Sequence, residues 1–262
     1  FEEPLDLNLV FSGHGKHLDC PTLQLANHHG LMIAGEAALS NWDAGMDMYI
    51  YGKLGNLIMT KEGINVLMTN LTGKVPPILQ RLDYIRFNGE AAGYLHDLTL
   101  TGLFYTGAGM VKTDVMMSID EQSMSRTYSG SVASADLDLG KLLNQEKKFG
   151  KVDFNVELKG FNYKNRYPES YIKGIISSFE YSQYQYENIM LDGVYKDGGF
   201  NGRLSMDDAN GSVQIDGNFN VAKTIPDFNL KASVKNLRPH DLHLSDKYEN
   251  ASISLGLTAD FT

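Results

Sequence analysis

The chain has 262 residues, of which 42% are hydrophobic and 21% are charged, and its formal net charge is -9. A chain of this length and composition can bury a sizeable core, in one domain or two. The acidic balance argues against nucleic acid as a partner, because phosphate binding needs clustered Lys and Arg.

The first residue is Phe1 rather than Met, and the longest apolar stretches are far shorter than the ~18 residues of a membrane-spanning segment. We therefore expect a fragment of a longer protein, whose anchor or targeting signal would lie outside it. Cys20 is the single cysteine, so an internal disulfide is excluded. We expect it to be a small buried hydrophobic residue rather than a catalytic thiol.

Alternation of apolar and polar residues predicts strands in the first part of the chain, at 5–13, 22–26, 31–39 and 46–54. Period two is typical of a strand with one face covered and one face in water. The stretch 57–71 fits neither strand nor helix spacing and is left open. A short amphipathic helix is predicted at about 75–83, where Pro76 and Pro77 suit a first helical turn.

Strands then resume, separated by turn sequences such as Ser182-Gln183, Asp197-Gly198-Gly199 and Asn210-Gly211. The predicted strands are 85–91, 97–105, 110–119, 128–136, 152–158, 172–181, 186–195, 200–206, 211–221, 227–236 and 251–259, with one helical turn at 139–143. Since no helix-length crossover separates them, we predict an antiparallel meander.

One short phrase recurs along the chain. Residues 85–93 (IRFNGEAAG) and 152–160 (VDFNVELKG) share Phe, Asn, Glu and a closing Gly, and looser copies lie at 7–15 and 253–259. The closing glycines, Gly93 and Gly160, are predicted to form bends between strands. Such repeats predict an elongated, solenoid-like sheet. We expect 1–262 to be one elongated segment, divisible into sub-units 1–74, 84–150 and 151–262.

Catalytic and metal-binding motifs are absent from the sequence. It has no nucleophile elbow, phosphate loop or dinucleotide fingerprint, and its histidines lack metal-ligand spacing. We therefore expect neither enzymatic activity nor a cofactor. A cluster of aromatic residues is read mainly as cross-strand pairing, with sugar binding as the alternative: Phe161, Tyr163, Tyr167, Tyr171, Phe179, Tyr181, Tyr184, Tyr186 and Tyr195.

Residues 172–208 resemble the TamB branch of the AsmA-like envelope proteins, in the form found in Bacteroidota. The pattern is Ser-Phe-x-Tyr at a strand end, a tight turn, Tyr-x-x-Asn-Ile-x-Leu-x-Gly, and then Gly-x-Phe-x-Gly-x-Leu. The Pro-Pro-x-Leu-x-x-Leu helix before Ile85 is similar to that family too. The resemblance extends over most of the chain beyond Leu5, although 57–71 and 166–171 carry little of it.

This resemblance implies a noncatalytic protein of the periplasm and cell envelope, anchored in the inner membrane by a segment outside this chain. Such proteins form a taco-like β-trough whose apolar interior is thought to carry phospholipid acyl chains toward the outer membrane, and some are tied to outer-membrane protein assembly. Combined with the strand pattern, it predicts an acyl-chain groove lined by Leu9, Phe11, Ile33, Phe87, Val152, Phe154, Val156, Leu158, Leu191, Phe200, Leu204, Val213 and Ile215. The alternatives are an assembly scaffold for outer-membrane proteins and a carbohydrate-binding surface module.

Overall fold

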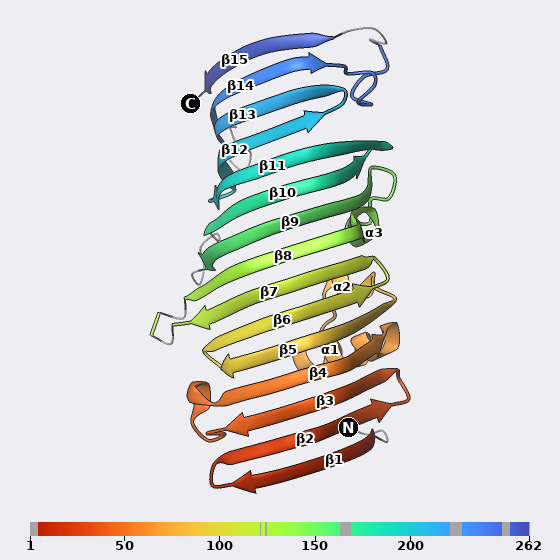
Figure 1. Cartoon of the computed structure of the whole chain (residues 1–262), viewed down its shortest axis with the longest axis vertical. Helices are drawn as coiled ribbons and strands as arrows, with labels where there is room; N and C mark the ends of the chain where they lie inside the picture. The colour runs from red at the N-terminus through yellow and green to blue at the C-terminus, as the bar shows by residue number, and fades with distance from the viewer. Residues whose placement is uncertain are drawn as a thin grey trace. The chain divides into compact units, whose positions relative to one another are not determined.

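The computed structural model describes residues 5–120, 122–123, 125–162, 169–220, 227–247 and 252–261. They form an antiparallel sheet of 15 strands whose order follows the chain (Figure 1). This confirms the all-β meander predicted from the alternating pattern. Tyr163 and Tyr167 of the aromatic cluster lie outside the described residues, as do residues 221 and 251 of two predicted strands.

The elements alternate between long strands and a few short helical segments. The strands are β1 Leu5–His14, β2 His17–Asn27, β3 Leu31–Ser40, β4 Tyr49–Thr60, β5 Tyr84–Tyr94, β6 Asp97–Thr106, β7 Gly109–Ile119, β8 Arg126–Asp138, β9 Phe149–Asn162, β10 Glu169–Tyr181, β11 Tyr184–Lys196, β12 Gly199–Asp208, β13 Gly211–Asn220, β14 Asp227–Leu237 and β15 Ile253–Phe261. The helices are the 3-10 turn η1 Gly45–Asp47, α1 Lys61–Thr72, α2 Pro77–Gln80 and α3 Leu139–Leu143.

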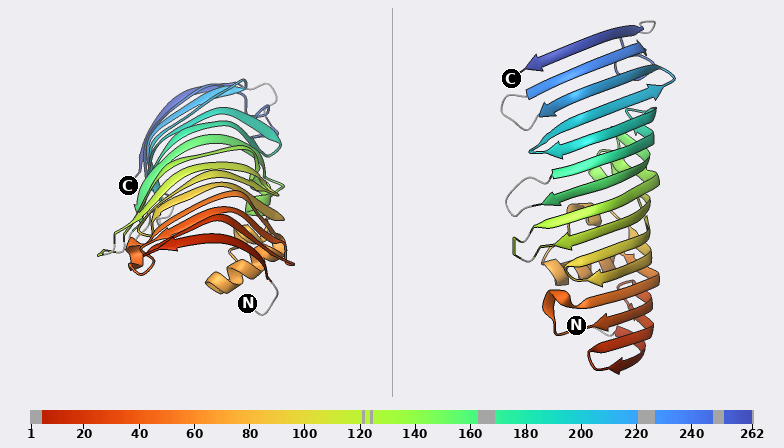
Figure 2. Two further views of the ribbon diagram at one scale, coloured as in Figure 1. Left: turned by 60° about the horizontal axis from the view of Figure 1, so that its bottom comes forward. Right: turned by 60° about the vertical axis from the view of Figure 1, so that its left-hand side comes forward.

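The chain divides into two compact units. Unit 1 comprises residues 1–119 and 141–144, and unit 2 comprises residues 120–140 and 145–262. Within each unit the strands form a single curved layer (Figure 2). In unit 1, α1 and α2 lie on the concave side of that layer. The division into 1–74, 84–150 and 151–262 stays a prediction.

The stretch 57–71, which the sequence pattern left open, contains a junction between a strand and a helix. β4 continues to Thr60, and the Thr60 hydroxyl accepts a hydrogen bond from the Gly63 N–H at 3.3 Å, which caps the start of α1. Gly73 ends α1 in the left-handed conformation, with φ of 73°. The stretch fitted neither strand spacing nor helix spacing, because its apolar spacing changes from that of a strand to that of a helix after Thr60.

The predicted helix at 75–83 is shorter in the structure than expected. α2 covers only Pro77–Gln80, because Pro76 has an extended ψ of 139° and Arg81 N–H already bonds in a tighter turn to Ile78 O at 3.3 Å. The helical turn predicted at 139–143 is α3, with the same bounds.

The recurring phrase lies on β1, β5, β9 and β15. The last three of these strands each follow a segment outside the sheet: α1 and α2, α3, and the turns at 238–247. The prediction for its closing glycines is wrong. Gly93 pairs with Leu98 inside the β5–β6 ladder, and Gly160 pairs with Ser170 inside the β9–β10 ladder. The β5–β6 turn comes later, at Leu95 and His96, because the strand is longer than the phrase.

Candidate functional site

One face of the sheet in unit 1 is apolar. Residues directly opposite each other in an antiparallel pair point to the same face, so the register defines rows of side chains that cross the strands. One row consists of Leu7, Leu25, Ile33, Leu57, Phe87, Phe104 and Val111. Another on the same face consists of Leu18, Leu39, Ile50, Gly93, Leu98 and Met117.

Unit 2 has an apolar face built in the same way. One row runs through Val132, Val156, Gly174, Leu191, Leu204, Ile215, Ala232 and Leu257. Its neighbour runs through Ser134, Phe154, Ile176, Ile189, Met206, Val213, Val234 and Leu255. In each unit, "apolar face" below means the face that carries these rows.

The register assigns all but one of the predicted groove residues to an apolar face. Those in unit 1 are Leu9, Ile33 and Phe87, and those in unit 2 are Val152, Phe154, Val156, Leu158, Leu191, Phe200, Leu204, Val213 and Ile215. Phe11 is different, because it lies at a register shift between Val10 and Ser12 and is 66% exposed. The role of these residues in binding a lipid stays a prediction.

Sequence reasoning missed many members of the rows. The full row across unit 1 needs Leu57, which falls in the stretch where the sequence pattern changes from strand to helix. Others, such as Leu25 and Phe104, continue the alternation of strands that had been predicted, so period two alone could have found them.

Paired glycines allow aromatic rings to lie against the backbone on these faces. In unit 1, a Cβ on Gly102 would be 2.6 Å from Phe87 Cε2 and 2.8 Å from Gly89 Cα. In unit 2, a Cβ on Gly193 would be 2.5 Å from Phe200 Cζ. Covering strand glycines with an aromatic ring restores packing that glycine itself cannot provide. Two of the predicted groove residues, Phe87 and Phe200, therefore lie over glycine backbone.

The segments outside the sheet bury only part of each apolar face. The buried apolar side chains lie in these segments and in the strands and turns near them: Ile64, Leu82, Ile85, Phe87 and Ala108 in unit 1, and Leu137, Val152, Tyr186 and Leu242 in unit 2. Toward the outer strands the same faces are open, with Leu9 in β1 40% exposed and Leu257 in β15 49% exposed. Each face is thus apolar, covered in part, and open at its outer strands.

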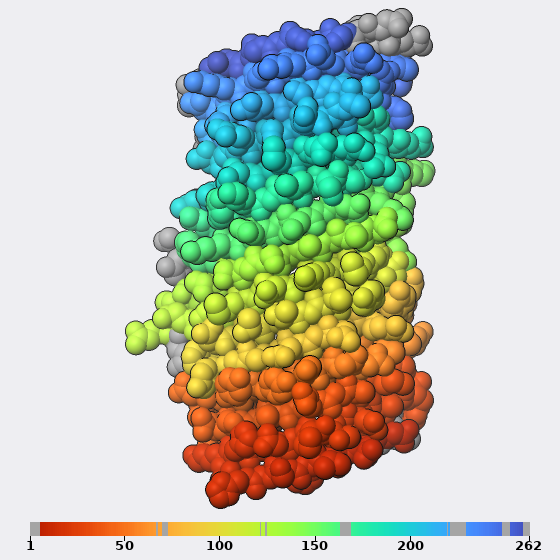
Figure 3. Space-filling model, viewed as in Figure 1, coloured from red at the N-terminus to blue at the C-terminus, as the bar shows by residue number. Residues whose placement is uncertain are grey.

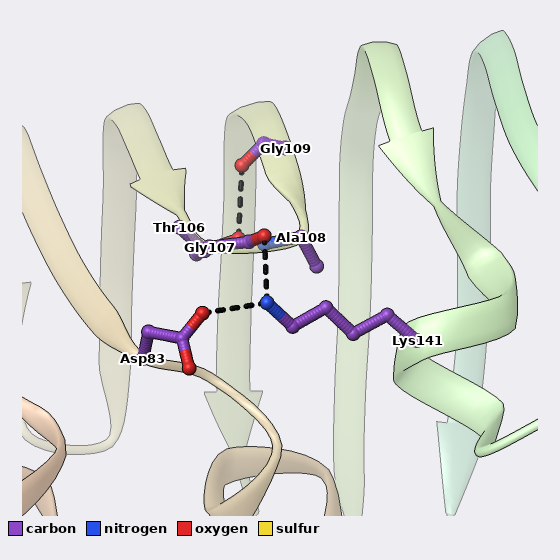
Figure 4. Close-up of polar contacts among 6 residues, drawn as sticks. All are labelled: Asp83, Thr106, Gly107, Ala108, Gly109 and Lys141. Carbon is purple, nitrogen blue, oxygen red and sulfur yellow. Dashed lines mark hydrogen bonds and ion pairs between the residues drawn. The ribbon is translucent and has the colours of Figure 1, made fainter.

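Within unit 1, a polar latch joins Lys141, a residue of α3, to Asp83 and the turn at Gly107 (Figure 4). Lys141 Nζ donates to Asp83 Oδ2 at 2.6 Å and to the Gly107 carbonyl at 3.1 Å. The hydrogen bond from Lys141 lowers the pKa of Asp83 below its ordinary value, and the Lys141 charge acts in the same direction. Arg81 adds a hydrogen bond to the Leu142 carbonyl. Thr106 closes the adjoining turn by donating to the Gly109 carbonyl at 2.9 Å.

In unit 2, residues 238–247 form a compact turn that lies against β11 and the turn at Ser182, and we call it the rim segment. The Tyr186 hydroxyl donates to the Leu242 carbonyl at 2.7 Å, and His243 Nδ1 is 2.9 Å from the Ser182 carbonyl. The Tyr184 ring meets the His243 ring edge-on at 5.8 Å. Burial, followed by the hydrogen bond that its hydroxyl donates to Asp208, raises the pKa of Tyr184 to about 12.

The opposite face of unit 2 carries charges of alternating sign. The register aligns Glu157, Lys173, Asp192, Arg203, Asp216 and Lys231 across six strands. Arg203 Nη2 is 2.9 Å from Asp216 Oδ2, and Lys173 Nζ is 3.9 Å from Asp192 Oδ2. An open groove of 780 Å³ crosses this row, and its lining carries three carboxylates and two cationic side chains.

The structure separates the tyrosines of the aromatic cluster. Phe179 and Tyr186 are cross-strand partners, as are Tyr181 and Tyr184, on the apolar face. Tyr171 lies on the opposite face and donates to Asp192 Oδ1 at 2.8 Å. The cluster is therefore not one continuous aromatic surface.

Other sites are not evident in the described part of the chain. Cys20 is half-buried in β2 and donates to the Thr22 carbonyl at 3.2 Å. Among the residues that the structure describes, no group of three or more His, Cys, Asp or Glu side chains is placed to hold a metal ion. Within the same residues, no helix combines the length and apolar character needed to cross a membrane. In the space-filling view of the face opposite the helices of unit 1, the atoms form bands that follow the order of the chain (Figure 3).

Comparison with known proteins gives no relative. No family model matches the chain, and neither a curated protein nor a solved structure is similar to it.

Proposed function

We propose that the chain is a noncatalytic segment of a periplasmic β-trough that binds phospholipid acyl chains and bridges inner and outer membranes. The observation that carries this proposal is the pair of partly open apolar faces, each built from rows of aliphatic and aromatic side chains. Burial of an acyl chain there would contribute ~0.8 kcal/mol per methylene group. The resemblance to the TamB branch supports the same function.

The contrast between the apolar faces and the charged opposite face suits a ligand that has an apolar part. The opposite face of unit 2 carries charges of alternating sign, such as the Arg203–Asp216 pair, so it favours contact with water. An acyl chain needs no hydrogen-bond partner, and the apolar faces provide few. This division favours lipid over carbohydrate, whose hydroxyl groups require convergent polar side chains.

The first prediction tests the apolar face of unit 2. Val156→Glu places a carboxylate on that face, and we expect it to abolish copurification of phospholipid, measured by mass spectrometry of the purified chain. Asn155→Glu is the matched control, because it adds the same charge to the next residue of β9 on the opposite face. It should retain lipid.

A second substitution on the same face distinguishes loss of lipid binding from a folding defect. Leu257 is 49% exposed on the same face, so Leu257→Glu adds a charge without burying it fully. Its control is Thr258→Glu, on the opposite face of β15. A folded wild-type chain that carries no phospholipid and does not bind a labelled phospholipid contradicts the proposed function. Binding that is lost equally in the control variants also contradicts it.

A further inference from the structure

The rim segment of unit 2 is held in a compact shape by its own backbone. Leu242 N–H donates to the Arg238 carbonyl at 3.0 Å, and Leu244 N–H donates to the Pro239 carbonyl at 2.8 Å. Within this turn the two leucines differ sharply. Leu242 has no exposed surface, whereas Leu244 is 53% exposed. The segment therefore directs one aliphatic side chain inward and leaves the other in solvent.

The position of Leu242 is fixed by an apolar-face residue. Tyr186, whose hydroxyl donates to the Leu242 carbonyl, is opposite Phe179, and Phe179 is opposite Val152. Val152 is one of the predicted groove residues. Leu242 is thus anchored at the end of a row that belongs to the apolar face.

Polar contacts tie the rim segment to β11 and to the turns at Ser182 and Asn210. They are the Tyr186 bond to Leu242, the His243 contact with Ser182, and an Arg238 N–H bond of 2.9 Å to the Asn210 carbonyl. Each involves the backbone of the rim segment or a ring nitrogen. Leu242 is the fully buried leucine of this segment, and Pro239 beside it is buried too.

We propose that Leu242 occupies the end of the acyl-chain site of unit 2, and so determines how far a bound chain extends over the apolar face. This inference rests on the proposed function. A leucine side chain and the end of an acyl chain have the same chemistry, so they are alternative occupants of the same apolar space. Leu242 is then a specificity-determining residue for chain length.

The test compares the affinity of fatty acids of increasing chain length in the full chain, measured by displacement of a fluorescently labelled phospholipid. Truncation of a buried leucine leaves an apolar cavity, and such cavities stay dry and accept apolar guests. In Leu242→Ala the affinity should continue to rise to longer chains than in the wild type. For the longest chains we expect binding about tenfold tighter, the effect of burying roughly two more methylene groups.

Leu244→Ala is the matched control, because it makes the same change at an exposed position of the same segment. Leu242→Val, a smaller truncation, should give an intermediate shift, and it replaces Leu242→Ala if that variant loses its native circular dichroism spectrum. A further variant, Tyr186→Phe, removes the hydrogen bond to the rim segment but keeps Leu242. It should alter chain-length preference less than Leu242→Ala does.

The outcomes separate this inference from the proposed function. If the wild type binds and Leu242→Ala behaves like Leu244→Ala, the role of Leu242 is overturned and acyl-chain binding stands. If only Leu242→Ala binds, the role of Leu242 is supported, and binding by the native chain is overturned. If neither binds a chain of any length, both are overturned.

Discussion

The glycines of the apolar faces are required by the close approach of neighbouring groups. Gly89 and Gly102 are cross-strand partners, and the Phe87 ring lies over both. A methyl group at either position would meet backbone as well as the ring, so a small movement of one side chain cannot accommodate it.

Gly102→Ala is therefore expected to destabilise the protein by about 1–3 kcal/mol, the usual cost of overpacking. Gly52→Ala is the control, because a Cβ there would have no atom within 4 Å. Urea unfolding followed by circular dichroism measures both. Equal stability of the two variants would contradict this, because it would mean that both the neighbouring backbone and the Phe87 ring move away without cost.

Tyr184 is expected to link stability to alkaline pH. An unfolded tyrosine loses its proton near pH ~10, whereas the raised pKa of Tyr184 in the fold is about 12. The folded state therefore holds more protons in this interval, and stability falls as pH rises. The stabilising contribution is complete below pH ~10 and disappears as pH rises through the folded pKa.

The measurement is the absorbance titration of tyrosinate in the wild type and in Tyr184→Phe. The difference between the two titration curves should show one tyrosine whose pKa lies well above the ordinary tyrosine value. In Asp208→Asn the same group should titrate at lower pH, since the hydrogen bond to a carboxylate is lost. A difference curve centred on the ordinary tyrosine pKa contradicts the assignment.

At the scale of elements, the charged row on the polar face of unit 2 favours one register. A shift of one residue would move every apolar side chain of a strand to the other face, and a shift of two would break the alternation of charge. Arg203 is central to this row, because carboxylates of Asp192 and Asp216 lie on both sides of it.

Arg203→Glu should destabilise the protein by about 1–2 kcal/mol, since like charges then face each other across two strand pairs. Arg203→Gln removes the charge without adding repulsion and should cost less. Because these side chains are exposed, added salt should reduce the difference between the two variants. Thermal unfolding at low and high salt provides the comparison, and a salt-independent difference would contradict it.

Sequence reasoning could predict most elements, because period two persists along the strands and turn residues separate them. It failed where a strand pattern changed into a helix pattern and where a helix was very short. The junction at Thr60 combines the end of β4 with a helix cap, and α2 is too short for its apolar spacing to define its ends. The packing of the rim segment could not be predicted from the sequence either. The burial of Leu242 depends on Tyr186, a residue 56 positions earlier in the chain.

At the scale of the whole molecule, each strand of the meander pairs with its neighbours in sequence. Stability in such an array is approximately a sum of local terms. Loss of packing in one unit should therefore have little effect on strands far from it.

Phe87→Ala tests this locality. Removal of a buried phenylalanine costs about 3–5 kcal/mol, and we expect it to increase amide hydrogen exchange in β4, β5 and β6. Exchange in β11, β12 and β13 should stay as in the wild type. Mass spectrometry of proteolytic fragments resolves these regions. Faster exchange in every strand would show instead that the chain unfolds as one cooperative unit.

The order of the strands has a consequence for biosynthesis. The latches at the strand ends and outside the sheet also point backward along the chain: Thr60 reaches back 31 residues to His29, Lys141 reaches back 58 to Asp83, and His243 reaches back 61 to Ser182. A chain that emerges gradually from a ribosome or a translocation pore can therefore add one hairpin at a time to the edge of those already formed. Each latch can close soon after its own residues emerge, so assembly can keep pace with delivery of the chain.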